Sequence, residues 1–196
     1  MAHLLPCILP KNLVVCHTQQ QQPGFRLSLS NLERMIQLAE SFFATRDDPD
    51  QISVTPEVME QLRQLHPATL SELDEGSGPV AWVLLIPTTD ELMKQFIANR
   101  INERLLLERT PVPGVYGAVY LCSALVLPEY RGRGIAKRLT CTAVKSLQAD
   151  HPIKHLFYWA FSPEGEKLAI SVAREVGLPL LKRPDDLSNT LKRLNP

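Results

Sequence analysis

A continuous apolar run, residues 80–86, is the feature that most restricts how this chain can fold. The run is rich in branched residues, and Gly78, Pro79 and Pro87 bound it. A strand with one face in water alternates apolar and polar residues, so a run without polar positions predicts a strand that is covered on both faces. Such a strand needs packed layers above and below it, and we therefore expect it at the centre of a sheet.

Amphipathic helices alternate with apolar strands around this run. Ser30 with Glu33 has the spacing of a capping box, and Thr55 followed by Pro56 is typical of a second helix start. The further expected helices cover residues 90–109, from about 134 onward, and 162–177. The further expected strands cover residues 115–127 and 153–161, with short strands at 26–29, 178–182 and 190–194. This order predicts a mixed α/β fold, with a central mixed β-sheet flanked by helices.

The length of 196 residues and the composition favour one domain over residues 25–196, preceded by an irregular arm over residues 1–24 that holds three prolines and a run of glutamines. Lys plus Arg and Asp plus Glu both number 21, so no bulk charge attracts nucleic acid. The apolar runs are far shorter than the roughly 20 residues of a membrane-spanning helix. The four cysteines lack metal-site spacing. We expect a cytoplasmic protein without a nucleic-acid partner, membrane partner or metal.

The segment from Leu125 to Ala136 predicts an anion site. It consists of a strand end, a turn with two glycines, and the start of a helix whose first amides have no intrahelical partner. Those amides and the helix dipole favour negative charge, and Arg131 and Arg133 add positive charge. We expect a diphosphate here, and the alternative is an ordinary strand-to-helix turn with solvated arginines. The P-loop and GxGxxG patterns are both absent.

At these residues the sequence resembles the GCN5-related N-acetyltransferase superfamily, whose acetyl-CoA motif is [RQ]xxGx[GA]. Arg131, Gly134 and Ala136 match the motif, and the preceding segment 126–130 has the form that the superfamily commonly shows. The likeness covers about residues 121–178 well, and the earlier part of the chain only in the order of its elements. The resemblance implies the acetyltransferase fold, with acetyl-CoA as co-substrate.

The resemblance also implies where acetyl-CoA binds. In the superfamily the pantetheine arm pairs with the strand before the motif, and the pyrophosphate lies on the amides of the turn. The matching positions here are Ala124, Leu125, Val126, Arg131, Gly132, Arg133, Gly134, Ile135, Ala136 and Lys137. General chemistry agrees, since an extended amide arm needs main-chain donors and acceptors and a diphosphate needs a helix start.

Two positions depart from the superfamily pattern. Ala173 stands where many members have the tyrosine that is thought to protonate the departing thiolate, and Glu166 stands where many have asparagine. The catalytic group is therefore unknown. Tyr120, Tyr158 and Ser162 lie on or at the ends of strands that flank the expected cleft, and they are the candidates.

The resemblance implies an acyl-CoA-dependent N-acyltransferase that moves acetyl to a primary amine by direct attack. The acceptor is expected to be a small-molecule or peptide amine, and a homodimer is allowed. The alternative is a non-catalytic acetyl-CoA-binding sensor or interaction module, which Ala173 favours. The long helix expected over residues 90–109 replaces a short turn of the superfamily and is expected to shape or cover the acceptor site.

Overall fold

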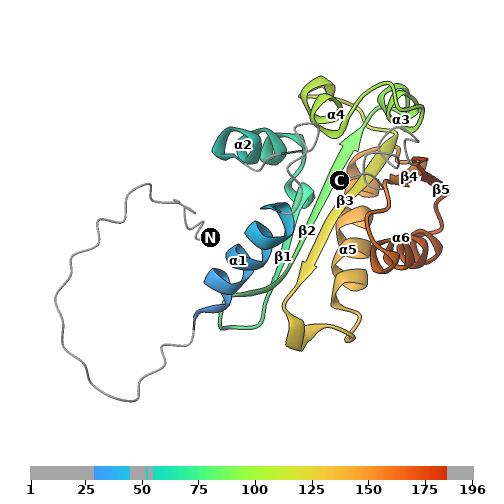
Figure 1. The fold of residues 1–196 in the computed structure, drawn as a ribbon. Coiled ribbons are helices and arrows are strands. Elements are labelled where there is room, and N and C mark those ends of the chain that lie inside the picture. Colours follow the sequence, from blue (N-terminus) through green and yellow to red (C-terminus); the bar gives the residue numbers. More distant parts are fainter. Residues whose placement is uncertain (1–28, 45–51, 53–54, 185–196) are drawn as a thin grey trace, which may run out of the picture.

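The computed structural model describes residues 29–44, 52 and 55–184, as a mixed α/β fold with one five-stranded sheet flanked by helices (Figure 1). The strands are β1 Leu70–Asp74, β2 Pro79–Thr88, β3 Ala118–Val126, β4 His155–Tyr158 and β5 Leu180–Lys182. The helices are α1 Asn31–Ala44, α2 Pro56–Leu65, α3 Asp90–Ile97, α4 Glu103–Arg109, α5 Ile135–Asp150 and α6 Pro163–Val176, with short 3₁₀ turns η1 Pro67–Thr69 and η2 Pro128–Tyr130. The expected mixed α/β fold and mixed sheet are confirmed.

Some expectations fall on other parts of the chain. The arm over residues 1–24 and the strand at 190–194 lie outside the described residues, as does the strand at 26–29 except for Leu29, which belongs to no strand. Among the described helices, none is long and apolar enough to cross a membrane.

The five strands follow one another in chain order across the sheet. The pairs β1–β2 and β2–β3 are antiparallel, whereas β3–β4 and β4–β5 are parallel. β3 pairs with β2 along its whole length, but with β4 only over residues 118–120. A register shift against β2 makes Cys122 an extra residue in β3, which is a β-bulge and bends the strand. From this point on, β3 and β4 separate.

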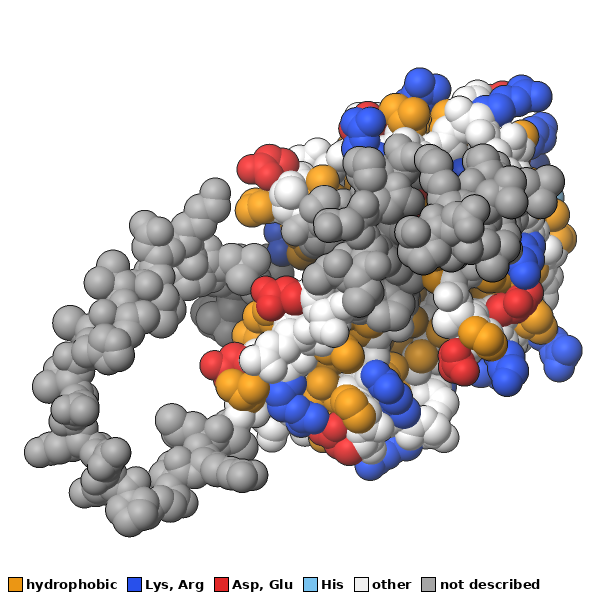
Figure 2. Space-filling model, in the orientation of Figure 1, with side chains coloured by type: hydrophobic (Ala, Val, Ile, Leu, Met, Phe, Trp, Pro, Cys, Tyr) orange, Lys and Arg blue, Asp and Glu red, His pale blue; other side chains and the backbone are white. Residues whose placement is uncertain are grey.

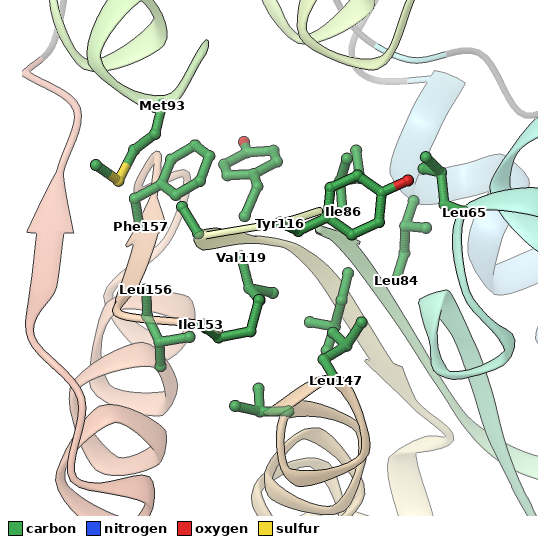
Figure 3. Close-up of a cluster of buried hydrophobic side chains, with 14 of the residues drawn as sticks. Leu65, Leu84, Ile86, Met93, Tyr116, Val119, Leu147, Ile153, Leu156 and Phe157 are labelled. Atoms are coloured by element: carbon green, nitrogen blue, oxygen red, sulfur yellow. The ribbon is translucent and has the colours of Figure 1, made fainter. Parts of the chain in front are cut away.

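Alternation along the strands assigns side chains to two faces of the sheet. Figure 3 shows Ile86 and Phe157 on one side of the sheet, and Val119 and Leu147 on the other. Phe96 of α3 contacts Phe157, with ring centroids 5.7 Å apart, so α3 covers the first face. Leu147 belongs to α5, which covers the second face together with α6. The central strand is thus covered on both sides, as the apolar run predicted.

The helix ends follow the capping signals in the sequence. The Ser30 N–H donates to Glu33 Oε2 at 2.8 Å and the Glu33 N–H donates to Ser30 Oγ at 3.3 Å, which is a complete capping box. Thr55 Oγ1 accepts the N–H of Val58 at 3.3 Å. Gly177 closes α6 with a φ of 70°, a conformation that favours glycine. These predictions are confirmed because each depends on neighbouring residues alone.

The single helix expected over residues 90–109 is wrong, because two helices occupy this segment. α3 and α4 are separated by a loop in which Asn99 has a φ of 56°. The Asn102 side chain then caps α4 by accepting the N–H of Leu105 at 2.8 Å. Asparagine tolerates the left-handed conformation and is a favoured N-cap. Asn99 and Asn102 therefore divide the expected helix, although the spacing of apolar residues continues across the break.

Gly117 precedes β3 at a point where the chain passes the start of α3. A Cβ atom here would lie 2.8 Å from both carboxylate oxygens of Asp90. The backbone has little room to move, because the Gly117 N–H donates to the Thr88 carbonyl at 3.0 Å and its carbonyl accepts the N–H of Lys154 at 2.7 Å. The missing side chain is therefore a steric requirement.

We expect Gly117→Ala to lower the free energy of unfolding by about 1–3 kcal/mol, the usual cost of overpacking, measured by urea denaturation. In an Asp90→Ala background the same change should cost clearly less, because the clashing carboxylate is gone. Equal losses in the two backgrounds would contradict this explanation.

Candidate functional site

A cavity of about 510 Å³ lies beside the second half of β3. Its walls come from β2 and β3, the first turns of α5, the segment that follows β4, and the beginning of α6, with Leu38 of α1 at one side. Five of the predicted cofactor residues line it: Ala124, Leu125, Val126, Arg131 and Ala136. The structure thus brings the predicted strand and two residues of the predicted turn to one cavity. The other predicted turn residues do not line it, namely Gly132, Arg133, Gly134, Ile135 and Lys137. Within the described residues, no group of three or more His, Cys, Asp or Glu side chains is arranged to hold a metal ion.

The cavity borders a stretch of β3 backbone that lies beyond the residues paired with β4. The Leu127 N–H donates to the Val80 carbonyl of β2 at 3.0 Å, and in an antiparallel pair alternate residues face the partner strand. This alternation directs the backbone groups of Leu125 toward β2. The backbone groups of Ala124 and Val126 point the other way, toward the cavity.

The turn between β3 and α5 presents a row of backbone N–H groups. Gly132 and Gly134 have φ values of 75° and 70°, and Gly134 is an N-cap without a side-chain hydrogen bond. In the described part of the chain, the N–H groups of residues 132–137 have no hydrogen-bond acceptor. Figure 2 shows Lys and Arg side chains beside hydrophobic ones at the lower end of the molecule, where Figure 1 places this turn. These are the elements of an anion site.

The two arginines of the turn are used mainly to hold its shape. Arg131 Nε donates to the Val126 carbonyl at 3.0 Å, and an Arg133 N–H donates to the Glu129 carbonyl at 2.8 Å. The Arg133 guanidinium also lies 4.9 Å from the centre of the Tyr130 ring. Positive charge is therefore kept beside the turn, while its amides remain open.

An ion pair joins α1 to the same turn. The two terminal nitrogens of Arg34 contact the two carboxylate oxygens of Glu129 at 2.7 and 2.6 Å, which is the bidentate geometry that favours arginine. The hydrogen bond from Arg34 lowers the pKa of the Glu129 carboxyl. Sequence reasoning missed this contact, because the two residues are 95 positions apart.

Two of the three catalytic candidates reach the cavity. Tyr158 and Ser162 line it. The Tyr158 hydroxyl donates to Glu166 Oε1 at 3.0 Å, and Lys182 Nζ donates to the same oxygen at 2.8 Å. The pKa of Tyr158 is raised, first by burial and then by the Glu166 carboxylate. The pKa of Glu166 is lowered by its hydrogen bonds from Lys182 and Tyr158. Ser162 Oγ accepts the N–H of Gly165 at 3.0 Å and caps α6.

The third candidate, Tyr120, is not part of the cavity lining. Its ring lies between Phe96 and Phe157, with centroid distances of 4.9 and 5.2 Å, and its hydroxyl donates to the carboxylate of Glu103. This places it on the face of the sheet that α3 covers, whereas Tyr158 contacts α6 on the opposite face. The expectation that Tyr120 flanks the cleft is corrected by this alternation.

Sequence reasoning also missed Trp159 and Phe161, which line the cavity directly after β4. Their rings pack against each other with centroids 4.4 Å apart. A general rule would have found them, because ligands in sheets with parallel strands bind beyond the carboxyl ends of those strands. β3 and β4 are such a parallel pair.

We expect Arg34→Met to raise the pKa of the Glu129 carboxyl toward its ordinary value, because the guanidinium that stabilises the charged form is removed. Carboxyl NMR titration measures this shift. In the unaltered protein the ion pair is present above the lowered pKa of Glu129 and is lost as the pH falls through it. Arg63→Met is the control, since Arg63 pairs with Glu60 of its own helix at 3.9 Å. A Glu129 pKa that is the same in both variants would refute the assignment.

Comparison with known proteins adds no further guide to this site. No family model, no curated protein and no solved structure matches the chain. The function therefore has to be argued from the cavity and the turn.

Proposed function

We propose that this protein is an acyl-CoA-dependent N-acyltransferase of the GCN5-related superfamily, which transfers acetyl from acetyl-CoA to a primary amine of a small molecule or peptide. The observation that carries the proposal is that one cavity borders both the β3 backbone beyond its pairing with β4 and the turn whose amides lack acceptors. Coenzyme A joins an extended arm with two amides to a diphosphate. The two features of the site match these two parts of one molecule.

In this proposal the backbone groups of Ala124 and the N–H of Val126 bind the pantetheine arm as an added strand would, while the Val126 carbonyl is held by Arg131. The amides of residues 132–137 bind the diphosphate, with the positive end of the α5 dipole behind them. Arg131, which lies in the cavity wall, adds charge beside the phosphates. The order of strands and helices from β1 to β5 also supports the resemblance to the superfamily.

The reaction needs few protein groups. The neutral amine attacks the thioester carbonyl carbon, the C–N bond forms, and the C–S bond breaks with release of the thiolate. The amine loses one proton and the thiolate takes up one, so the protons balance. Holding the two reactants in line supplies roughly 7–11 kcal/mol, and a thiol with a pKa near 8.5 leaves readily at neutral pH.

Tyr158 keeps its proton in this scheme. Burial and the adjacent Glu166 carboxylate raise its pKa above that of an ordinary phenol, and hence further above that of a thiol. Transfer of the Tyr158 proton to the thiolate is therefore uphill. The proton that ends on sulfur comes from the amine instead, and Tyr158 serves the cavity as a fixed hydrogen-bonding group.

One observation favours a second function, that of an acetyl-CoA-binding module without catalysis. Ala173, which stands at the usual position of the catalytic tyrosine, is 6% exposed and belongs to the hydrophobic core. Tyr120, the nearest tyrosine in the strand before the motif, lies on the other face of the sheet. Neither residue supplies an acid in the cavity.

We expect coenzyme A to raise the melting temperature of the protein, with a stabilisation of about 2.7 kcal/mol at a hundredfold excess over the dissociation constant. Gly134→Glu should abolish this effect, because it puts a negative side chain beside the diphosphate. The matched control is Gly177→Glu, which carries the same φ of 70° and the same charge at the far end of α6. The proposal fails if coenzyme A does not stabilise the unaltered protein, or if the two variants respond alike.

We expect Ala173→Tyr to separate the two functions. In the superfamily the general acid stands at this position, and such an acid typically contributes 10² to 10⁴-fold to a rate. Ala173 itself is not among the residues that line the cavity. The same change risks overpacking, at roughly 1–3 kcal/mol, because the site is buried. Thiol release from acetyl-CoA with a panel of amines, and urea denaturation, are measured on both proteins.

Turnover by the unaltered protein supports the enzyme. Turnover that appears only in a folded Ala173→Tyr protein supports the binding module, because the unaltered protein then binds the cofactor without catalysing transfer. A folded variant that binds coenzyme A normally, but transfers acetyl to no amine, like the unaltered protein, supports the binding module.

A further inference from the structure

The α3–α4 pair reaches the cavity through one buried side chain. Among the described residues, none of α3 or α4 lines the cavity. Arg183, which follows β5 and is 8% exposed, contacts both this helical pair and the cavity wall. A buried guanidinium is costly unless its donors and its charge are satisfied, so its partners define what it holds in place.

On one side, Arg183 is bonded to the loop between α3 and α4. Its Nε donates to Asn99 Oδ1 at 2.5 Å, and a terminal N–H donates to the Ile101 carbonyl at 3.2 Å. The Asn99 amide also donates to the Pro184 carbonyl at 3.5 Å. The left-handed backbone at Asn99 aims this side chain at Arg183, which gives the break between the two helices a structural role.

On the other side, the Arg183 guanidinium lies between two rings. It is 4.3 Å from the centre of Phe96 of α3 and 4.5 Å from the centre of Trp159. Trp159 in turn packs on Phe161, and both rings line the cavity. The Arg183 N–H also donates to the Tyr158 carbonyl at 2.9 Å. Arg183 is therefore attached to the cavity wall twice, by its guanidinium on the Trp159 ring and by its backbone N–H on the Tyr158 carbonyl.

We propose that Arg183 is a positioning residue, through which the α3–α4 pair fixes the Trp159 and Phe161 wall of the cavity. The planar guanidinium stacks on a ring and donates in its own plane at the same time, which the ammonium of lysine does not. Residues 159–161 have no strand partner in the described sheet. Backbone hydrogen bonds to neighbouring strands hold β4, whereas contact with the Arg183 guanidinium holds the segment that follows it. The consequence for coenzyme A affinity rests on the proposed function, whereas the fixed position of the wall does not.

The fluorescence of Trp159 can be used to measure how accessible its ring is to solvent. The chain has two tryptophans, so in a Trp82→Phe background the emission comes from Trp159 alone. Acrylamide quenching is measured on the ligand-free full chain with Arg183→Lys and with Asn99→Gly, which keeps the left-handed backbone but removes the amide. Arg174→Lys, on the exposed side of α6, is the matched control.

We expect Arg183→Lys to raise the acrylamide quenching constant of Trp159 clearly above the control, and Asn99→Gly to raise it less, because the ring contact remains. If Arg183→Lys does not fold, Asn99→Gly decides the question alone. Quenching constants equal to the control in every folded variant overturn the proposal. An unchanged far-UV circular dichroism spectrum shows that a higher quenching constant does not come from a general loss of structure.

A second measurement tests the consequence for the site. We expect Arg183→Lys to weaken coenzyme A binding about two- to thirtyfold, the range for residues that act on a site through others. Unchanged affinity in a variant whose Trp159 has become accessible overturns the link between the wall and the site. If the unaltered protein binds no coenzyme A, the proposed function fails, and the quenching result still decides the position of the wall.

Discussion

The separation of β3 from β4 is the constraint on which the rest of this structure depends. The two strands pair over three residues and then part, at the point where Cys122 is inserted into β3. A continuous sheet would use every backbone group of β3 in its own ladder. Because the pairing stops, Ala124 and Val126 keep backbone groups that face a cavity, and the helices α5 and α6 close the space from one side of the sheet.

The charge of the site is organised by the backbone more than by side chains. Arg131 bonds to the carbonyl of Val126 at the end of β3, Arg133 bonds to the carbonyl of Glu129 in the turn, and Arg34 is paired with the Glu129 side chain. What remains available for a ligand is the row of amides at the start of α5. This arrangement suits an anion that arrives with its own charge and geometry, because the donors are already in position and no side chain has to be released first.

The parts of the fold that could be predicted from sequence are those set by neighbouring residues. The capping box at Ser30, the cap at Thr55 and the closing Gly177 all act within one helical turn, and all are confirmed. The apolar run predicted a central strand for the same reason. β1 was not predicted, because its sequence, with Leu70 and Leu73 three positions apart, lacks the apolar and polar alternation of a half-buried strand.

The site could be predicted in part. The strand and turn residues were found by their motif, whereas the Trp159 wall and the Arg34 contact depend on residues far apart in the chain. The face of Tyr120 relative to the cavity-lining half of β3 was also beyond the sequence, because the inserted Cys122 changes the alternation within β3. Periodicity likewise did not reveal the division between α3 and α4, since the spacing of apolar residues continues where the backbone turns at Asn99.

The short, acidic β1 has a consequence for how the protein behaves at high concentration. An outer strand with open backbone groups invites other chains to pair with it, and that pairing leads to aggregation. β1 has only five residues, carries two carboxylates, and shifts its register between Leu73 and Asp74, all of which oppose an incoming strand. The molecule thus discourages strand addition at this outer border. The other unpaired stretch of strand, the second half of β3, borders a cavity, where access is limited to what fits that space.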